Sequence, residues 1–223
     1  MAAQQEIRLR LADDGDIDRL IDIHYDCFKQ APFTRYVWRN VANSEMDYKS
    51  VMRHYNFRQY FRSESHIIMV AERTTGAGRL VVGYCIWEWA TNPDINGGSG
   101  IALVQQIRDQ QREKEVGFGS ITPSWWSVEE IAVDRQFQGL NIARILLGWG
   151  LKIADDRNWL VAVMSSPAST GLYEKTGFHY HGGNQPAARR EIKVRGESEG
   201  CNIFIMKRVP QAGPLVVYYL STA

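Results

Sequence analysis

The sequence is poor in cysteine and has no excess of charge of either sign. Its three cysteines, Cys27, Cys85 and Cys201, are far apart and odd in number, which argues against a disulfide framework or a cysteine-based zinc cluster. We expect three buried thiols in a reducing compartment. Lys and Arg number 26 and Asp and Glu 25, so the chain lacks the broad basic field of a duplex-binding protein. We therefore expect no nucleic-acid partner.

Long apolar runs, secretion signals and metal-ligand patterns are missing as well. The N-terminal stretch MAAQQEIRLR has no apolar segment of the signal-peptide kind, and no apolar run approaches the roughly 18 residues of a membrane span. No Asn-X-Ser/Thr glycosylation acceptor occurs, and the histidines are scattered without the spacing of metal ligands. The expectation is a soluble, cytoplasmic protein with no membrane partner and no metal.

The sequence does contain an ordinary core and an alternation of strand and helix patterns. Its 223 residues, 44% of them hydrophobic, predict one domain over residues 1–223. Strand patterns cover residues 6–12, 66–73, 79–90, 125–134, 159–166, 178–183 and 201–209, and a hairpin loop is expected at 74–78. Helical patterns cover 13–28, 46–61, 140–156 and a short segment of 168–177 that ends at Gly177.

Two segments depart from this alternation. Residues 91–123 combine loop composition with a polar helical pattern, and we expect an insertion at the rim of a site. The C-terminal tail, 209–223, has strand composition. This tail either pairs with a sheet edge or pairs with a second subunit, and the second alternative predicts a homodimer.

The segment DRQFQGLNIARILL, residues 134–147, joins a strand to a helix. Strand, turn, helix and strand in this order form a right-handed unit in which the helix begins at the carboxyl end of the first strand. The free N–H groups and the dipole of that helix favour a phosphate, and Gly139, Asn141 and Ala143 leave room for one. The alternative is an ordinary connection in which Gly139 relieves a turn and Asn141 caps the helix. Arg135 and Arg144 flank the turn. They either reach the phosphates of a ligand or are simply exposed arginines at a helix start.

The stretches VEEIAVDRQFQGLNIARILL and SSPASTGLYEKTGF together resemble the cofactor-binding core of the GCN5-related N-acetyltransferase (GNAT) family. Gln138, Gly139 and Ala143 match the family's glycine-containing motif, and Asn141 stands where the family usually has glycine. The segment LYEKTGF, residues 172–178, matches the family's second motif closely. The order of the expected elements over roughly residues 6–208 agrees with the resemblance.

The resemblance implies an α/β (α+β) fold with a mixed, mostly antiparallel sheet of about six to seven strands flanked by helices. A V-shaped splay would separate the fourth and fifth strands. Acetyl-CoA, the implied cosubstrate, would lie in this splay and pair with backbone groups of Ile131 and Val133, while its pyrophosphate would sit on N–H groups from Gln138 to Ala143. The implied cofactor-binding residues are Ile131, Ala132, Val133, Gln138, Gly139, Leu140, Asn141, Ile142, Ala143, Arg144, Ser166 and Ser169.

The family's chemistry is direct acetyl transfer from acetyl-CoA to an amine, which needs an acid for the thiolate and a base for the amine. Tyr173 stands at the family's position for the acid, and the alternative is a tyrosine that only packs against the cofactor. Glu129 is the expected base, on the strand that faces the opening. Glu130 points the other way if the strand alternates regularly, but a bulge would exchange the two. For each glutamate, the alternative to a catalytic role is that of an exposed surface residue.

Tryptophans crowd the expected acceptor side. Trp87 and Trp89 share one face of a strand and Trp125 opens the cofactor strand. They either pack in the core or wall an acceptor pocket roofed by residues 91–123. With no acidic tract for a histone tail, we expect a small-molecule amine acceptor. The alternatives are an acyl-CoA-binding module without turnover, or a GNAT-fold protein with other thioester or carbon chemistry.

Overall fold

The computed structural model describes residues 7–31, 34–35, 44–63, 66–76, 78–91, 124–180, 189–192 and 201–211. All but the first residue of the expected insertion at 91–123, and residues 212–223 of the tail, lie outside these ranges. The rim position of the insertion and the role of the tail therefore stay predictions. Among the described helices, none combines the length and the apolarity of a transmembrane segment.

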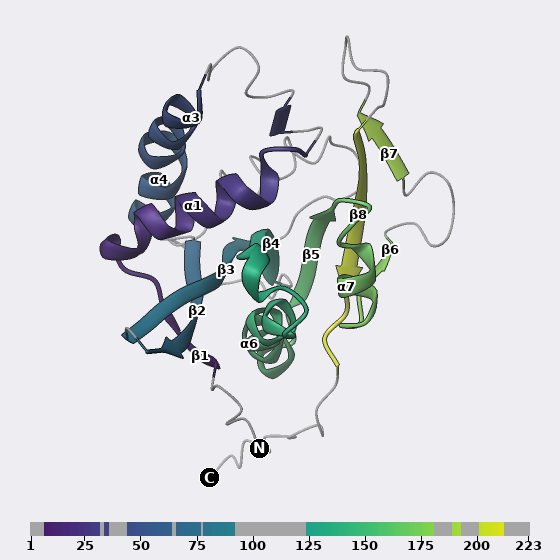
Figure 1. Cartoon of the computed structure of the whole chain (residues 1–223). Coiled ribbons are helices and arrows are strands. Elements are labelled where there is room, and N and C mark those ends of the chain that lie inside the picture. The colour runs from purple at the N-terminus through teal and green to yellow at the C-terminus, as the bar shows by residue number, and fades with distance from the viewer. Residues whose placement is uncertain are drawn as a thin grey trace.

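A single mixed sheet organises the chain, in the order β1-β2-β3-β4-β5-β8-β6 with β7 beside β8 (Figure 1). The strands are β1 (Ile7–Leu11), β2 (His66–Thr75), β3 (Gly78–Thr91), β4 (Ser124–Val133), β5 (Leu160–Ser165), β6 (His179–Tyr180), β7 (Arg189–Ile192) and β8 (Cys201–Arg208). Only the β4 and β5 pair is parallel among the described pairs. The mixed, mostly antiparallel sheet is thus confirmed. The polar four-residue strand β7 was missed because it is too short to show an alternating pattern.

The described helical segments are α1 (Ile17–Phe28), α3 (Glu45–Val51), the π-helix η2 (Met52–Phe57), α4 (Arg58–Arg62), α6 (Ile142–Arg157) and α7 (Thr170–Glu174), with 3-10 turns η1 (Asp14–Asp16) and η3 (Arg135–Phe137). Some of the helical segments begin at a side-chain cap, among them η1 and α3. Asp13 accepts a hydrogen bond from the N–H of Gly15, and Asp16 accepts one from the N–H of Asp13. This capping box starts the 3-10 turn η1, which leads directly into α1 where the acidic run predicts a helix.

The two faces of the sheet carry separate cores. Helices α1, α3 and α4 cover one face and α6 covers the other (Figure 1). Tyr84 and Ile86 of β3 point to the α1 face, and Val82 and Trp87 point to the α6 face. Burial on both faces explains why the middle of β3 is almost continuously apolar.

The hairpin between β2 and β3 is shorter than the sequence predicts. Thr74 pairs with Arg79 and Thr75 with Gly78, so both threonines continue the strand, whereas a loop over 74–78 was expected. Gly78 has φ 121°, a backbone angle that only glycine adopts easily, and this lets the chain reverse within so few residues.

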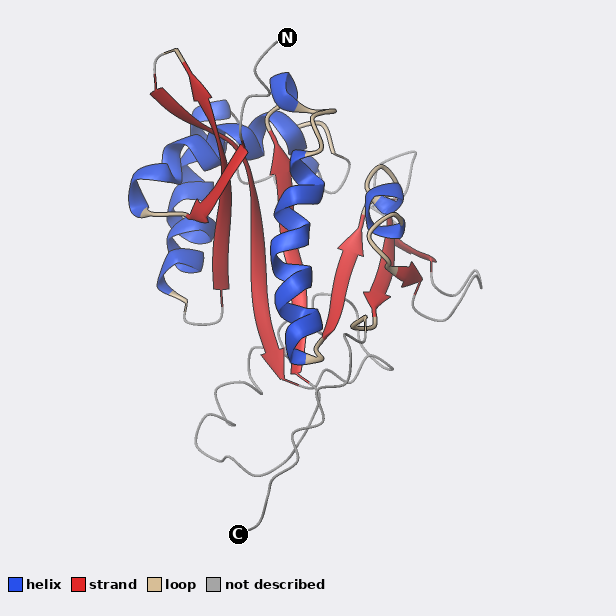
Figure 2. Cartoon of the chain, turned by 90° about the horizontal axis from the view of Figure 1, so that it is seen from below, coloured by secondary structure: helices blue, strands red, loops and turns tan. Residues whose placement is uncertain are grey.

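Two irregularities in β4 shape the centre of the sheet. In its pairing with β3, Ile86 lies opposite Glu130 and Trp87 opposite Val128, so Glu129 is the extra residue of a β-bulge. Its pairing with β5 ends at Val128 and Val163. Beyond that pair the two parallel strands diverge toward their carboxyl ends, which confirms the expected splay between the fourth and fifth strands (Figure 2).

Candidate active site

The edge of β4 that faces the splay has backbone groups directed away from β3. The N–H of Asp134 donates to the carbonyl of Val82 at 2.9 Å, and the groups of a strand alternate in direction, so those of Ile131 and Val133 point toward β5. No described strand pairs with β4 here. The carbonyl of Val133 accepts from Gln138 Nε2 at 3.0 Å and Cys27 Sγ at 3.2 Å. The N–H of Val133 and both groups of Ile131 thus face the opening.

The turn from β4 into α6 adopts the left-handed conformation twice. Gly139 has φ 80° and Asn141 has φ 64°. Asparagine is one of the few residues that tolerate this angle, which explains how Asn141 replaces glycine here. Its side chain makes no capping hydrogen bond, so it does not satisfy the helix start. A Cβ atom added to Gly139 would meet nothing within 4 Å, so the turn borders open space.

The first turn of α6 leaves N–H groups available in this space. The N–H of Ile145 donates to the carbonyl of Asn141 at 3.1 Å, so the helical ladder begins there and Ile142, Ala143 and Arg144 precede it. The first turn has no acidic residue. Arg135 and Arg144 are exposed on either side. A sixteen-residue helix with this start favours an anion.

Ser165 at the end of β5 and the two serines that follow it, Ser166 and Ser169, are linked by hydrogen bonds. Ser165 Oγ lies 3.1 Å from Ser169 Oγ, and Ser166 Oγ lies 2.9 Å from the same atom. Ser169 precedes α7 as its N-cap residue. These hydrogen bonds stabilise the turn between β5 and α7.

Tyr173 of α7 is 3% exposed and packs its ring 5.3 Å from that of Phe178. Burial, with a smaller contribution from nearby Cys85, raises the pKa of the Tyr173 phenol well above its ordinary value. The hydroxyl therefore keeps its proton at neutral pH, the state that an acid needs. Burial also raises the pKa of the Cys85 thiol.

The bulge at Glu129 turns Glu130 to the α1 face. Ala132, two residues on, packs in the α1-side core, whereas Trp126 and Val128 before the bulge pack on the α6 side. Tyr84 donates a hydrogen bond to Glu130 Oε1, and His24 Nε2 lies 3.1 Å from Oε2. Glu129 Oε1 accepts from Ser127 Oγ at 3.3 Å.

Trp87 packs in the core, one of its two alternatives, and does not wall an acceptor pocket. Its side chain is fully buried on the α6 face, with its ring 4.9 Å from that of Trp126. Trp89 and Trp125 lie on the adjacent paired strands β3 and β4, and their side chains fall outside the described part of the structure. Alternation places two tryptophans on one face, but it does not tell which layer covers that face.

The cysteines differ in burial. Cys85 is fully buried as expected, whereas Cys27 is only half-buried beside Val133, and the side chain of Cys201 lies outside the described residues. Burial raises the pKa of the Cys27 thiol to about 11, so this thiol stays protonated. The described residues contain no cluster of three or more His, Cys, Asp or Glu side chains arranged around a metal position.

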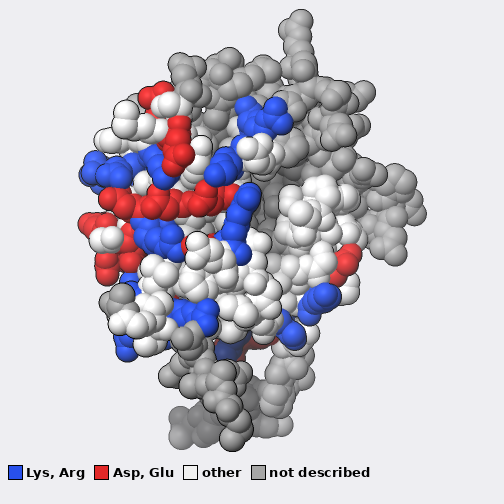
Figure 3. Space-filling view, viewed as in Figure 1, with Lys and Arg blue, Asp and Glu red and all other residues white. Residues whose placement is uncertain are grey.

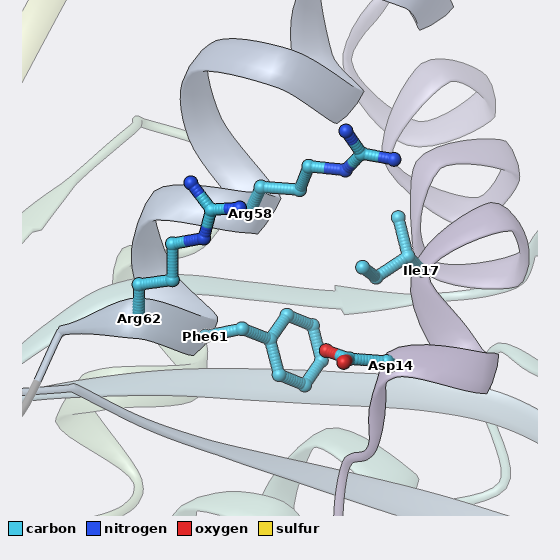
Figure 4. Close-up of a pocket in the computed structure, with 5 residues that line it drawn as sticks. All are labelled: Asp14, Ile17, Arg58, Phe61 and Arg62. Carbon is cyan, nitrogen blue, oxygen red and sulfur yellow. The ribbon is translucent and has the colours of Figure 1, made fainter.

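A surface pocket of about 490 Å³ lies elsewhere, between the start of α1 and α4 (Figure 4). Its lining residues are Asp14, Ile17, Arg58, Phe61 and Arg62. Ile17 is ten residues before Cys27 on the same helix, about 15 Å along the axis. This pocket is therefore separate from the splay. We base the candidate site on the open edge of β4, which an extended ligand fills better than a compact one.

Sequence comparison identifies the family. The model of the Acetyltransferase (GNAT) family matches residues 20–178, most of the chain, and the chain therefore belongs to this family of acetyltransferases. The match includes the β4–α6 turn and Tyr173, so both of the motifs that suggested the resemblance lie within it. No curated protein matches the chain in sequence.

Solved structures agree on the fold. Arabidopsis thaliana NAA60 in complex with a bisubstrate analogue has a TM-score of 0.57 at 12% identity, covering 93% of this chain and 100% of that one. The Corynebacterium glutamicum protein described as histone acetyltransferase HPA2 and related acetyltransferase has a TM-score of 0.54 at 15% identity, covering 94% of this chain and 99% of that one. YncA, a putative acetyltransferase of Salmonella typhimurium with acetyl-CoA, has a TM-score of 0.53 at 15% identity, covering 93% of this chain and 96% of that one. At these identities the likeness shows the fold alone.

Proposed function

We propose that this GNAT-family chain transfers an acetyl group from acetyl-CoA directly to the amine of a small molecule. The observation that carries the proposal is the open edge of β4 beside a helix start without acidic residues. An extended ligand with an anionic end needs both the strand edge and the helix start. The strand edge offers hydrogen bonds along the chain, and the helix start offers N–H groups to the phosphates.

The residues of the site fit acetyl-CoA. The N–H of Val133 and the backbone of Ile131 are available for its pantetheine arm, and the turn around Gly139 borders space that a side chain would narrow. The N–H groups of Ile142 to Arg144 are available for its pyrophosphate. Ser166 and Ser169 lie across the splay, and we assign them to the same ligand.

Acetyl-CoA would supply an acetyl group activated as a thioester, whose C–S bond breaks as a C–N bond to the amine forms. Tyr173 donates its phenolic proton to the leaving sulfur. Burial raises the pKa of the Tyr173 phenol, so the hydroxyl still carries the proton that the leaving thiolate takes. A glutamate of β4, Glu129 or Glu130, takes the proton of the amine.

A small acceptor agrees with the charges around the site. Acidic and basic side chains interleave over α1 and α3, and few charges lie over β5 and α7 (Figure 3). Lys49 pairs with Asp22 at 2.6 Å and with Glu45 at 2.8 Å, and Lys29 pairs with Asp26 at 2.8 Å. These carboxylates are neutralised within the protein. They do not form the acidic groove that a basic peptide would need.

The test is release of free thiol from acetyl-CoA in the presence of amines. The panel contains short alkyl amines, polyamines and free amino acids, together with peptides that carry either a free N-terminus or a lysine behind a blocked N-terminus. We expect release that depends on the amine and is fastest for a small molecule, with the acetylated product found by mass spectrometry. Faster release with peptides would reject the acceptor class. Acetyl-CoA binding without release would indicate a binding module, and release without an acetylated amine would indicate other thioester chemistry.

A further inference from the structure

Four polar side chains from four elements form a hydrogen-bonded chain beneath the bulge of β4. Tyr48 of α3 places its hydroxyl 2.8 Å from His24 Nδ1, and Nε2 of the same ring lies 3.1 Å from Glu130 Oε2. Tyr84 of β3 donates to the other oxygen of Glu130. The side chain of Glu130 is 19% exposed and that of His24 8%, so the carboxylate is the member that a substrate reaches most easily.

Donor and acceptor rules fix the direction of this chain. A carboxylate only accepts, so Tyr84 and His24 Nε2 must both donate to Glu130. Burial, and then the charge of Glu130, raises the pKa of Tyr84 well above its ordinary value, which keeps its hydroxyl proton in place. A neutral imidazole with its proton on Nε2 has an acceptor at Nδ1, and the Tyr48 hydroxyl supplies the donor. This arrangement leaves the imidazole and both carboxylate oxygens with partners.

We propose that His24 is a positioning residue for acetyl transfer, which holds Glu130, rather than Glu129, as the base for the acceptor amine. This inference rests on the proposed function. Glu130 takes the amine proton as the new C–N bond forms: one N–H bond breaks, one O–H bond forms on the carboxyl group, and the proton passes to solvent after the product leaves. His24 and Tyr84 keep their own protons throughout.

The bulge and His24 act together in this account. The bulge directs Glu130 to the α1 face, but a glutamate side chain has three rotatable bonds and would sample several positions there. Hydrogen bonds to both of its oxygens, from β3 and from α1, reduce it to one position. Correct placement of a base is worth orders of magnitude in rate, because proton transfer requires contact distance. The acceptor amine then approaches from the α1 side of β4, the face opposite Trp87.

The first test compares Glu130→Gln with Glu129→Gln, using acetyl-CoA and the amine of the panel that gives the fastest thiol release. Glu130→Gln should lower kcat by about 10²-fold or more, the usual effect of losing a general base, and by at least about tenfold more than Glu129→Gln lowers it. The dissociation constant of acetyl-CoA should stay within about twofold in both. An equal loss in the two variants, or a larger loss in Glu129→Gln, overturns the assignment of the base.

The second test separates positioning from a merely structural role of His24. His24→Leu should lower kcat about 10-fold or more, with KM for acetyl-CoA unchanged. His24→Gln should recover most of that rate, because its amide can donate to Glu130 and accept from Tyr48. If both variants lose stability equally and keep kcat per folded molecule, His24 is structural and the inference falls. A wild type that binds acetyl-CoA but acetylates no amine overturns the proposed function and the inference together.

A third measurement does not depend on activity. A long-range ¹H–¹⁵N spectrum at pH 8, assigned with the His24→Gln variant, should show the His24 proton on Nε2 and none on Nδ1. A proton on Nδ1 with none on Nε2 would mean that the ring does not donate to Glu130, and the inference would be wrong.

Discussion

Gly150 of α6 lies directly against the buried indole of Trp87 on β3. A Cβ atom at Gly150 would overlap the six-membered ring of Trp87, so only glycine lets the helix approach the sheet this closely. The indole Nε1 is buried without a hydrogen-bond partner in the described structure, and the ring packs against that of Trp126. The contact fixes the distance between α6 and the sheet, and with it the place where α6 begins beside β4.

The first prediction compares two glycines of one helix. Gly150→Ala should destabilise the protein by about 1–3 kcal/mol, the usual cost of overpacking a core. Gly148→Ala is the control: its Cβ would meet nothing within 4 Å, and we expect a gain of about 0.5–1 kcal/mol from helix propensity. Urea unfolding of both variants measures the difference. Equal stabilities would contradict the close contact.

Local signals in the sequence predict the frame of the site, and contacts between distant segments decide its details. The acidic cap at Asp13 and the glycine turn at Gly139 act within a few residues, so their patterns predict the helix starts. The bulge at Glu129 depends on how β4 pairs with β3, which no local pattern contains. Spacing in the sequence therefore left Glu129 and Glu130 as alternatives.

The residues that sequence reasoning missed have the same explanation. His24, Tyr48 and Tyr84 are far from Glu130 in the chain and meet it only when α1 and α3 pack on the sheet. A polar His24 at a core-facing position of a predicted amphipathic helix was the available signal. For Trp87 the choice between the core and an acceptor pocket stayed open in the sequence, because alternation shows which residues share a face but not what covers it.

The second prediction concerns the left-handed residue before α6. Asn141→Gly should raise stability by up to about 1 kcal/mol because glycine adopts φ 64° without strain, and Asn141→Ala should lower it by about 1 kcal/mol. Thermal unfolding of both variants in the absence of ligand measures this. If alanine is tolerated as well as glycine, the left-handed turn does not form in solution.

The third prediction concerns the acid. Tyr173→Phe should lower kcat by about 10²-fold or more and leave acetyl-CoA affinity unchanged, because only the hydroxyl is lost from a buried ring. Tyr180→Phe on β6, which packs against Phe204 with ring centroids 5.5 Å apart, is the control and should keep the wild-type kcat. Steady-state kinetics of both variants decide the matter. A weaker affinity with unchanged kcat would make Tyr173 a packing residue.

The fourth prediction concerns the ion pair that ties β8 to α6, in which Arg208 is buried and Asp155 is half-buried. Arg208 is 4% exposed and donates to both oxygens of Asp155, at 2.7 and 2.8 Å. Asp155→Asn should destabilise the protein by about 3 kcal/mol because it leaves Arg208 without a counterion. Asp156→Asn is the control, since its pair with Lys152 is exposed and should contribute less than about 0.5 kcal/mol.

The same pair predicts a pH dependence. Burial alone would raise the pKa of Asp155, but hydrogen bonds from Arg208 and from the N–H of Gln211 outweigh it and hold that pKa below its ordinary value of 3.8. The stabilisation is therefore complete above the unfolded-state pKa and is lost as the pH falls through the folded-state value. Unfolding below about pH 4 should bring the wild type and Asp155→Asn closer together in stability. A constant difference down to pH 2 would contradict the ion pair.

The measurement that tests the account most directly is calorimetric titration of the wild type with acetyl-CoA, free CoA and ATP, beside two variants of Gly139. Gly139→Asn tolerates positive φ and carries no charge, whereas Gly139→Glu places a carboxylate in the open space at the helix start. We predict micromolar binding of acetyl-CoA and CoA to the wild type, weaker binding of ATP, near-normal binding to Gly139→Asn and none to Gly139→Glu. A wild type that binds neither CoA nor acetyl-CoA would contradict the proposed cofactor site, and so would a Gly139→Glu variant that binds them as tightly as the wild type does.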